Sequence, residues 1–193
     1  MVIESTRNET VKRARALAQR KGRLEQGVHF IEGEKLVREA VVSGAQFVDA
    51  FIEDGHDLMA AVLSGSGANV YTVRRSVMES LTQTGTPQWV CATVKTPEQP
   101  IPEYYPAGLI VALDCVQDPG NLGTILRTAD AMGACGLLLG EGCADPYAPK
   151  PLRAAMGSIY HIPVWQGNLE NEAARLAAQG FTLVCGHLKG TDV

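Results

Sequence analysis

Residues 118–134 read DPGNLGTILRTADAMGA, a glycine-containing turn that leads directly into an amphipathic helix. The first three residues predict a chain reversal, and Gly120 and Gly123 tolerate a positive φ and a close backbone approach. We expect the helix to begin near Asn121, whose side chain can cap free N–H groups. A turn of this kind either binds a phosphate group or only connects a strand to a helix.

The spacing of the polar residues in this stretch leaves both alternatives open. The motif matches neither GxxxxGK[ST] nor GxGxxG, so the common nucleotide-binding fingerprints do not apply. Asn121 and Arg127 are six residues apart, which is about 600° around a helix, so they do not share one face. They can converge only if Asn121 lies on the turn and the Arg127 side chain extends back along the helix.

The segments around this motif alternate between strand and helix patterns. GLIVALDCV (108–116) and GLLLGEG (136–142) are apolar runs typical of strands that are buried on both faces. A helix, a strand, a helix and a strand are predicted to follow at KPLRAAMGS (150–158), YHIPVW (160–165), LENEAARLAAQG (169–180) and FTLVCGH (181–187). This alternation predicts an α/β fold with a parallel sheet covered by helices on both faces.

A proline-rich segment divides the chain of 193 residues. TPEQPIPEYYPAG (96–108) holds four prolines and predicts an extended linker. The residues before it predict a second, small α/β unit, with helices at 9–21, 34–44, 56–65 and 74–83 and strands at 27–33, 46–54, 68–73 and 87–95. We therefore expect a domain at 1–96, a linker at 97–106 and a second domain at 107–193.

The charge is distributed unevenly. Residues 1–25 contain seven basic and three acidic side chains, a local charge of +4, whereas the whole chain carries −4. A basic segment on an acidic body indicates contact with a polyanion, because each Lys or Arg at a phosphate releases a counterion. The alternative is a solvated helix face.

The composition also bounds the cellular setting. The five cysteines form no CxxC pair and no cluster with the four histidines, which favours reduced thiols in a cytoplasmic protein and no metal site. The polar N-terminus does not resemble a signal peptide, and no apolar stretch is long enough to cross a membrane.

Three stretches together resemble a known enzyme family. VQDPGNLGTILRTADAMG (116–133) is similar to the first motif of the SpoU (TrmH-type) class of SPOUT RNA 2′-O-ribose methyltransferases. DPYAPKPLRAAMGSIYHIPV (145–164) resembles the second motif of that class, and residues 5–40 resemble its ribosomal-protein-like substrate-binding domain. The resemblance implies a knotted α/β catalytic domain that binds S-adenosylmethionine, acts as a homodimer and methylates RNA, with ribosomal RNA favoured over transfer RNA.

The resemblance also implies roles for individual residues. Asn121 and Arg127 match the motif residues placed beside the target ribose, with Arg127 as a proposed base. Because a guanidinium rarely gives up its proton, a clamp on the ribose or phosphate, oriented by Asn121, is the alternative role. RNA contacts are expected from a basic set with one serine: Arg7, Lys12, Arg23, Lys150, Arg153 and Ser158. Ser158 is equally compatible with capping a turn.

The sequence departs from the family at its third motif, a Gly-Asn-Glu-Gly turn and a Ser-Leu-Asn-rich segment that makes most cofactor contacts. Neither occurs before Val193, so the chain is expected to be a truncated or incomplete methyltransferase that binds the cofactor poorly on its own. The cofactor contacts expected within the chain are Gly186, His187 and Leu188. The alternatives are a non-catalytic RNA-binding protein, an inactive homologue and, if the match were chance, a phosphate- or nucleotide-binding domain.

Overall fold

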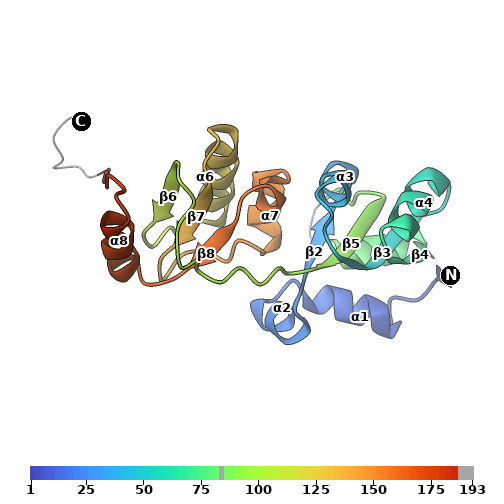
Figure 1. Cartoon of the computed structure of the whole chain (residues 1–193). Helices are drawn as coiled ribbons and strands as arrows, with labels where there is room; N and C mark the ends of the chain where they lie inside the picture. Colours follow the sequence, from blue (N-terminus) through green and yellow to red (C-terminus); the bar gives the residue numbers. More distant parts are fainter. Residues whose placement is uncertain (83–84, 187–193) are drawn as a thin grey trace.

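The computed structural model describes residues 1–82 and 85–186, which form two α/β units side by side (Figure 1). The extended segment 96–109 joins the last strand of the first unit to the first strand of the second. Within the described ranges, no helix is long and apolar enough to cross a lipid bilayer.

The first unit is built on a five-stranded sheet with the order β1-β4-β3-β5-β2. The first three strands in this order are parallel, and β5 is antiparallel to both of its neighbours. Burial of both sheet faces suits the apolar and β-branched residues of these strands. The strands are β1 (Val2–Ile3), β2 (Val28–Glu32), β3 (Phe47–Glu53), β4 (Asn69–Val73) and β5 (Val90–Lys95).

Helices cover both faces of this sheet (Figure 1). One helix pair packs its apolar residues against Phe51 and Cys91, and a second pair packs on the opposite face against Ala50 and Ala92. The first pair is α1 (Glu9–Ala16) and α5 (Arg75–Leu81), and the second is α3 (Glu34–Val42) and α4 (Asp57–Gly65). The short α2 (Arg20–Gln26) lies beside the end of α1.

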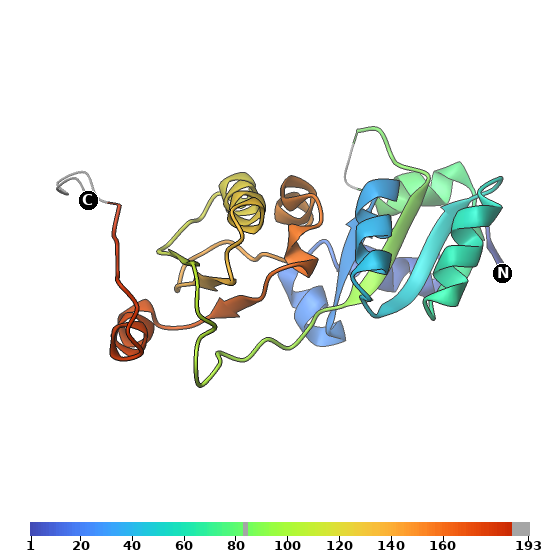
Figure 2. The same ribbon diagram turned by 45° about the horizontal axis from the view of Figure 1, so that its top comes forward.

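The second unit is built on a parallel sheet with the order β6-β7-β8. Leu137 and Leu139 belong to the core under α6 and α7, whereas Leu138 packs toward α8 on the other face. Figure 2 shows α8 separated from α6 and α7 by the strands. The elements are β6 (Ile110–Leu113), α6 (Pro119–Ala131), β7 (Gly136–Leu139), α7 (Pro149–Ala155), the 3₁₀-helix η1 (Ser158–Tyr160), β8 (Val164–Gln166) and α8 (Leu169–Ala178).

The predicted α/β fold with a parallel sheet is confirmed, but the single helix predicted at 9–21 is wrong. The chain turns after Ala16 and resumes as α2 at Arg20. Arg23 explains the break, because its Nη1 donates to the carbonyl oxygens of Leu17 at 2.6 Å and Ala18 at 3.2 Å. These carbonyls lie at the end of α1, where no helical N–H is available to them.

Three strand predictions in the second unit also need correction. β6 is not covered on both faces, since Ala112 is exposed and Ile110 and Val111 are half-buried. The strand predicted at 160–165 begins only at Val164, because Ser158–Tyr160 form a 3₁₀-helix. Residues 181–186 form no strand in the described structure. An apolar pattern alone does not make a strand, because the backbone groups also need a neighbouring strand to pair with.

The hydrophobic core is continuous across the junction between the two units. One cluster of buried residues contains Ile31 and Leu36 of the first unit together with Leu122, Leu152 and Ile159 of the second. Burial of these side chains removes apolar surface of both units from water at once. The two units are therefore packed against each other and not only tethered.

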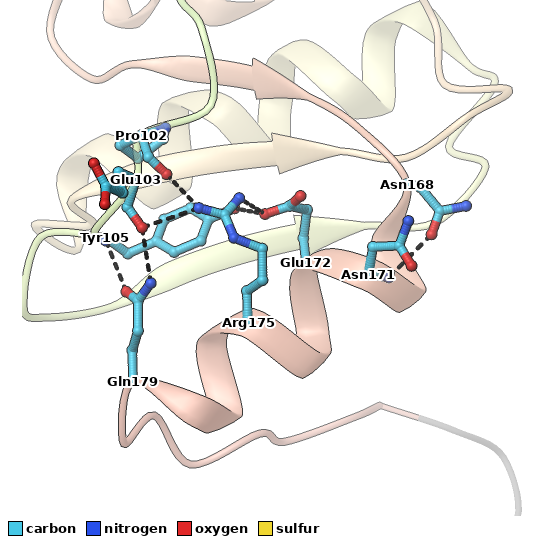
Figure 3. A network of polar contacts seen from close by, with 8 residues as sticks. All are labelled: Pro102, Glu103, Tyr105, Asn168, Asn171, Glu172, Arg175 and Gln179. Carbon is cyan, nitrogen blue, oxygen red and sulfur yellow. Dashed lines mark hydrogen bonds and ion pairs between the residues drawn. The ribbon is translucent and has the colours of Figure 1, made fainter.

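The proline-rich segment is held along α8 by a network of polar contacts (Figure 3). The Tyr105 hydroxyl donates to Glu172 Oε2 at 2.6 Å, and the Tyr105 N–H donates to Gln179 Oε1 at 2.9 Å. Arg175 Nη2 donates to the carbonyl oxygens of Pro102 at 2.7 Å and Glu103 at 3.0 Å. These contacts fix an extended backbone that forms no strand, so the segment is a strap and not a free tether.

Candidate active site

The turn before α6 is capped by Asp118 and not by Asn121. The helix begins at Pro119, and Asp118 Oδ1 accepts a hydrogen bond from the Asn121 N–H at 2.7 Å. This bond, followed by the nearby Lys150, holds the pKa of the Asp118 carboxyl below its usual value. Because a carboxylate already occupies the start of the helix, the structure disfavours a phosphate site there.

The glycines of the motif serve helix packing. Gly120 and Gly123 both lie within α6, and neither has a positive φ. A Cβ at Gly123 would lie 2.5 Å from the Pro151 carbonyl oxygen and 2.6 Å from Ala154 Cβ. Gly123 therefore allows α6 and α7 to approach closely, which brings the two sequence motifs together.

Asn121 and Arg127 are both exposed on α6, and the structure gives no hydrogen bond between them in its described part. Asn121 is in the first turn of the helix and Arg127 is six residues further, about 9 Å along the axis. The Arg127 guanidinium instead contacts α7, with Nη1 3.2 Å from the Met156 sulfur. Both side chains thus keep polar atoms available to a substrate, while Met156 supports the arginine.

Two backbone irregularities flank this pair. Cys115, between β6 and α6, and Met156, which ends α7, have φ values of 51° and 53° and are the non-glycine residues with positive φ in the described structure. This conformation is unfavourable for ordinary residues and persists where the surroundings enforce it, often at functional sites. At Met156 this conformation ends α7, and the thioether of the same residue contacts Arg127. Met156 was not among the predicted site residues, and only its place after a helix in the second motif could have indicated it.

The two basic residues of α7 differ in their surroundings. Lys150 Nζ lies 3.5 Å from Asp118 Oδ2, so the lysine partly neutralises the cap of α6. Arg153 is exposed and lines hollows on the side of the N-terminal unit, and no ion pair involves it in the described structure. Arg153 is therefore the better placed of the two to contact RNA.

The predicted RNA contacts of the N-terminal unit are not equivalent. Arg7 and Lys12 are exposed, with Lys12 paired to Glu9 at 2.7 Å. Arg23, by contrast, is 7% exposed and its Nη2 lies 2.6 Å from Asp145 Oδ2 of the second unit, so its RNA contact stays a prediction that this burial does not favour. Arg23 joins the two units and caps α1, which leaves no free donor face for RNA.

The RNA contact expected of Ser158 also stays a prediction that its burial does not favour. Ser158 is 5% exposed at the start of η1, and its backbone carbonyl oxygen accepts from the His161 N–H at 3.1 Å. Of the predicted cofactor contacts, Gly186 is exposed, whereas His187 and Leu188 lie outside the described residues.

Two histidines at the junction were not predicted. His29 is fully buried, with Nδ1 3.1 Å from Thr96 Oγ1 and Nε2 2.9 Å from the Tyr160 hydroxyl. Burial lowers the pKa of His29 to about 3, so the ring is neutral. His161 lies at the rim, with Nδ1 2.7 Å from Asp130 Oδ2 and Nε2 2.8 Å from Glu39 Oε1. The hydrogen bond to Asp130, followed by that to Glu39, raises the pKa of His161.

The chain is similar to known RNA methyltransferases over nearly its whole length. It is 37% identical over 178 residues to the 23S rRNA (guanosine(2553)-2′-O)-methyltransferase RlmP of Bacillus subtilis, covering 92% of this chain and 70% of that protein. The chain belongs to the SpoU rRNA methylase family. The model of this family matches residues 108–193, and that of the MRM3-like substrate binding domain matches residues 8–92.

Other SpoU relatives agree. Human mitochondrial rRNA methyltransferase 3 is 32% identical over 160 residues, covering 78% of this chain and 37% of that protein. The crystal structure of an rRNA methyltransferase from Sinorhizobium meliloti, 36% identical, superposes with a TM-score of 0.90 over 100% of this chain and 74% of that one. The AdoMet-bound structure of the rRNA methyltransferase from that organism gives a TM-score of 0.87 over 98% of this chain and 73% of that one. The family resemblance noted from the two motifs is thereby confirmed.

The described part of this chain contains no group of three or more His, Cys, Asp or Glu side chains arranged to hold a metal ion. Its candidate site is a polar amide and a guanidinium, Asn121 and Arg127, presented on a helix whose start is capped by Asp118.

Proposed function

We propose that the protein transfers a methyl group from S-adenosylmethionine to the 2′-hydroxyl of a ribose in ribosomal RNA. The observation that carries this proposal is Arg127, whose guanidinium is exposed, contacts Met156, and forms no ion pair in the described structure. Its position in the first motif of a SpoU methylase supports a role at the ribose. The relatives with printed rRNA and AdoMet names support the substrate and the methyl donor.

The residues of this chain act on the nucleophile. A ribose hydroxyl is a weak nucleophile, so the site has to orient it and assist loss of its proton. We assign Arg127 as a clamp that donates hydrogen bonds to the hydroxyl or the adjacent phosphate and stabilises the developing negative charge. Arg127 is not the base, because a guanidinium retains its proton at neutral pH, so the hydroxyl proton passes to solvent water as the methyl group is transferred.

Asn121 has a separate task in this proposal. Since Asp118 caps the helix, the Asn121 side chain is not needed for that purpose and remains exposed. Its amide carries both a donor and an acceptor, which suits orientation of a ribose edge. No hydrogen bond joins Asn121 to Arg127 in the described structure. We therefore assign the Asn121 side chain to the substrate and not to the arginine.

The methyl donor supplies an activated methyl group when it is bound. Gly186 is the one proposed cofactor contact in the described part of the chain, and a Cβ there would meet nothing within 4 Å. The described residues therefore form no enclosed cradle around Gly186, and the cofactor contacts of Gly186, His187 and Leu188 stay a proposal from the family resemblance. No step of the mechanism above depends on them.

The family resemblance extends the proposal to the assembly and setting of the protein. A homodimer, a knotted catalytic domain and a cytoplasmic location fit a SpoU methylase that modifies ribosomal RNA. Light scattering coupled to gel filtration tests the dimer directly, and a monomer at micromolar concentration would contradict it.

The central test is methyl transfer by Arg127 variants. In the full-length protein, Arg127→Ala is expected to lower the rate of tritium-methyl transfer to ribosomal RNA from a strain lacking the gene by at least about 100-fold. Cofactor affinity, measured by calorimetry, is expected to stay nearly unchanged. Arg127→Lys is the matched control, since it keeps the charge but loses the planar pair of donors, and we expect an intermediate rate.

Two outcomes would contradict this assignment. Unchanged transfer by Arg127→Ala would remove Arg127 from the reaction. RNA binding without any methyl transfer by the unaltered protein would favour the non-catalytic RNA-binding alternative.

A further inference from the structure

Two hollows lie in series between the N-terminal unit and α7. The first is bordered by Arg15 of α1, and the second by Lys35 near the start of α3 and by Met156 after α7. Both hollows are lined by Glu32, Leu36 and Arg153. Because they share these residues, the two hollows are neighbours along the junction of the two units, and we call this line of surface residues the seam.

The seam gathers cations that the protein does not neutralise. Nine of the sixteen Lys and Arg side chains in the described ranges take part in ion pairs. Arg15, Lys35 and Arg153 do not, and all three are exposed along the seam. Cations left free in this way are available to phosphate groups, whereas paired ones have to give up a partner first.

The carboxylates along the seam are already engaged. Glu34 Oε1 accepts from Arg38 Nε at 2.8 Å, and Glu32 Oε1 accepts from the Gln88 N–H at 3.3 Å. These bonds hold the acidic side chains within the N-terminal unit. The Gln88 amide leaves Glu32 its negative charge, but the charged side chains that line the two hollows are four basic and two acidic, so the net charge along the seam is positive.

The seam ends at the candidate active site. Met156 lines its second hollow, is 41% exposed, and contacts the Arg127 guanidinium through its sulfur. Its apolar, adaptable side chain suits the face of a base, while the cations on either side suit the backbone of the same strand. A strand that follows the seam would thus deliver a nucleotide next to Arg127.

We infer that the seam is the path of a single-stranded RNA segment, with phosphates on Arg15, Lys35 and Arg153 and a base against Met156, leading to the target ribose at Arg127. This inference rests on the proposed function. It adds Arg15, Lys35 and Met156 to the substrate contacts and leaves Lys12 and Lys150 in their intramolecular pairs.

The test measures RNA affinity as a function of salt. A fluorescein-labelled 20-nucleotide oligouridylate and 23S rRNA from a strain lacking the gene serve as probes. Arg15→Gln, Lys35→Gln and Arg153→Gln are each expected to weaken binding about 3- to 10-fold and to reduce the salt slope by about 0.7, the value for one lost single-strand phosphate contact. Met156→Ala is expected to weaken binding with no change in the salt slope.

Arg20→Gln and Lys95→Gln are the matched controls, because both residues are exposed and unpaired in the described structure but do not line the seam. Seam variants that bind and methylate RNA as the controls do would overturn the path while leaving the proposed function intact. An unaltered protein that neither binds nor methylates either RNA would refute the proposed function and the path together. Thermal denaturation of each variant identifies any loss of RNA binding that is caused by unfolding. If Arg15→Gln or Arg153→Gln unfolds, Arg15→Lys or Arg153→Lys takes its place in the comparison with the controls.

Discussion

A histidine lies on the buried side of the junction between the two units and another on its exposed side, and the two are held in opposite ways. His29 is fully buried, neutral and bound to two hydroxyl groups, and beside it Arg23 pairs with Asp145. His161 is half-exposed at the rim and bridges two carboxylates, one from each unit. The comparison teaches that the buried histidine joins the two units as a neutral, hydrogen-bonded group, whereas the exposed histidine joins them through its charge.

Loss of Arg23 is expected to have the largest effect on this comparison. Arg23→Ala leaves Asp145 without its partner and uncovers the carbonyl groups of Leu17 and Ala18. Breaking a buried pair from one side should lower the free energy of unfolding by about 3 kcal/mol in urea denaturation. Arg20→Ala is the control, since Arg20 is exposed, and should change it by less than about 0.5 kcal/mol. Equal effects of Arg23→Ala and Arg20→Ala on the free energy of unfolding would show that the buried Arg23–Asp145 pair does not stabilise the protein.

The effect of His29→Gln on the free energy of unfolding is expected to change sign with pH. At pH 7.5 the variant is expected to be about 1 kcal/mol less stable, because its hydrogen bonds to Thr96 and Tyr160 are impaired. The folded protein keeps His29 neutral down to about pH 3, whereas the unfolded chain protonates it near 6.5. Its stabilising contribution is therefore present above pH 6.5 and is lost as the pH falls, by up to about 1.4 kcal/mol per pH unit.

Urea denaturation of both proteins between pH 8 and pH 5 measures this reversal. The unaltered protein should lose stability faster than His29→Gln below pH 6.5, and the two curves should meet near pH 5.5 to 6. Parallel curves would mean that His29 is protonated in the folded state.

His161→Gln is expected to give the smallest effect, with the opposite sign of pH dependence. The two carboxylates raise the pKa of His161 in the folded protein, so its contribution is present below about pH 6.5 and is lost as the pH rises through the raised value. Because the side chain is 37% exposed, the loss at pH 6 should be about 0.5 kcal/mol, and smaller in 1 M salt. A larger effect at pH 9 than at pH 6 would contradict the bridge.

The sequence predicted those elements whose partners are local. Leu137, Leu138 and Leu139 form a buried run whose strand was predicted, and the helices at 119–131 and 169–178 follow their apolar periodicity. Gly123 was correctly expected to permit a close approach, but which element approaches, α7, depends on residues 28 positions further along the chain. The pairing of motifs was thus predictable from the family and not from the periodicity.

The sequence was least informative where a distant residue decides the local structure. Arg23 looked like one more cation in a basic segment, and only the fold brings Asp145, 122 residues away, to its guanidinium. The predicted helix at 9–21 failed for the same reason, because the Arg23 side chain satisfies the carbonyls that end α1. Met156 was overlooked because its importance lies in a positive φ and a contact with Arg127, which no sequence pattern reports.

The core shared by the two units has a consequence for how this protein changes over evolution. Ile31 and Leu36 lie in one apolar cluster with Leu122, Leu152 and Ile159, so a substitution on either side of the junction is felt by both units. The N-terminal unit is accordingly not an interchangeable module that can be exchanged for another RNA-binding domain at the proline-rich strap. A new RNA specificity of that unit is therefore expected to arise by substitutions on its outer surface, because its other face packs into the core shared with the catalytic unit.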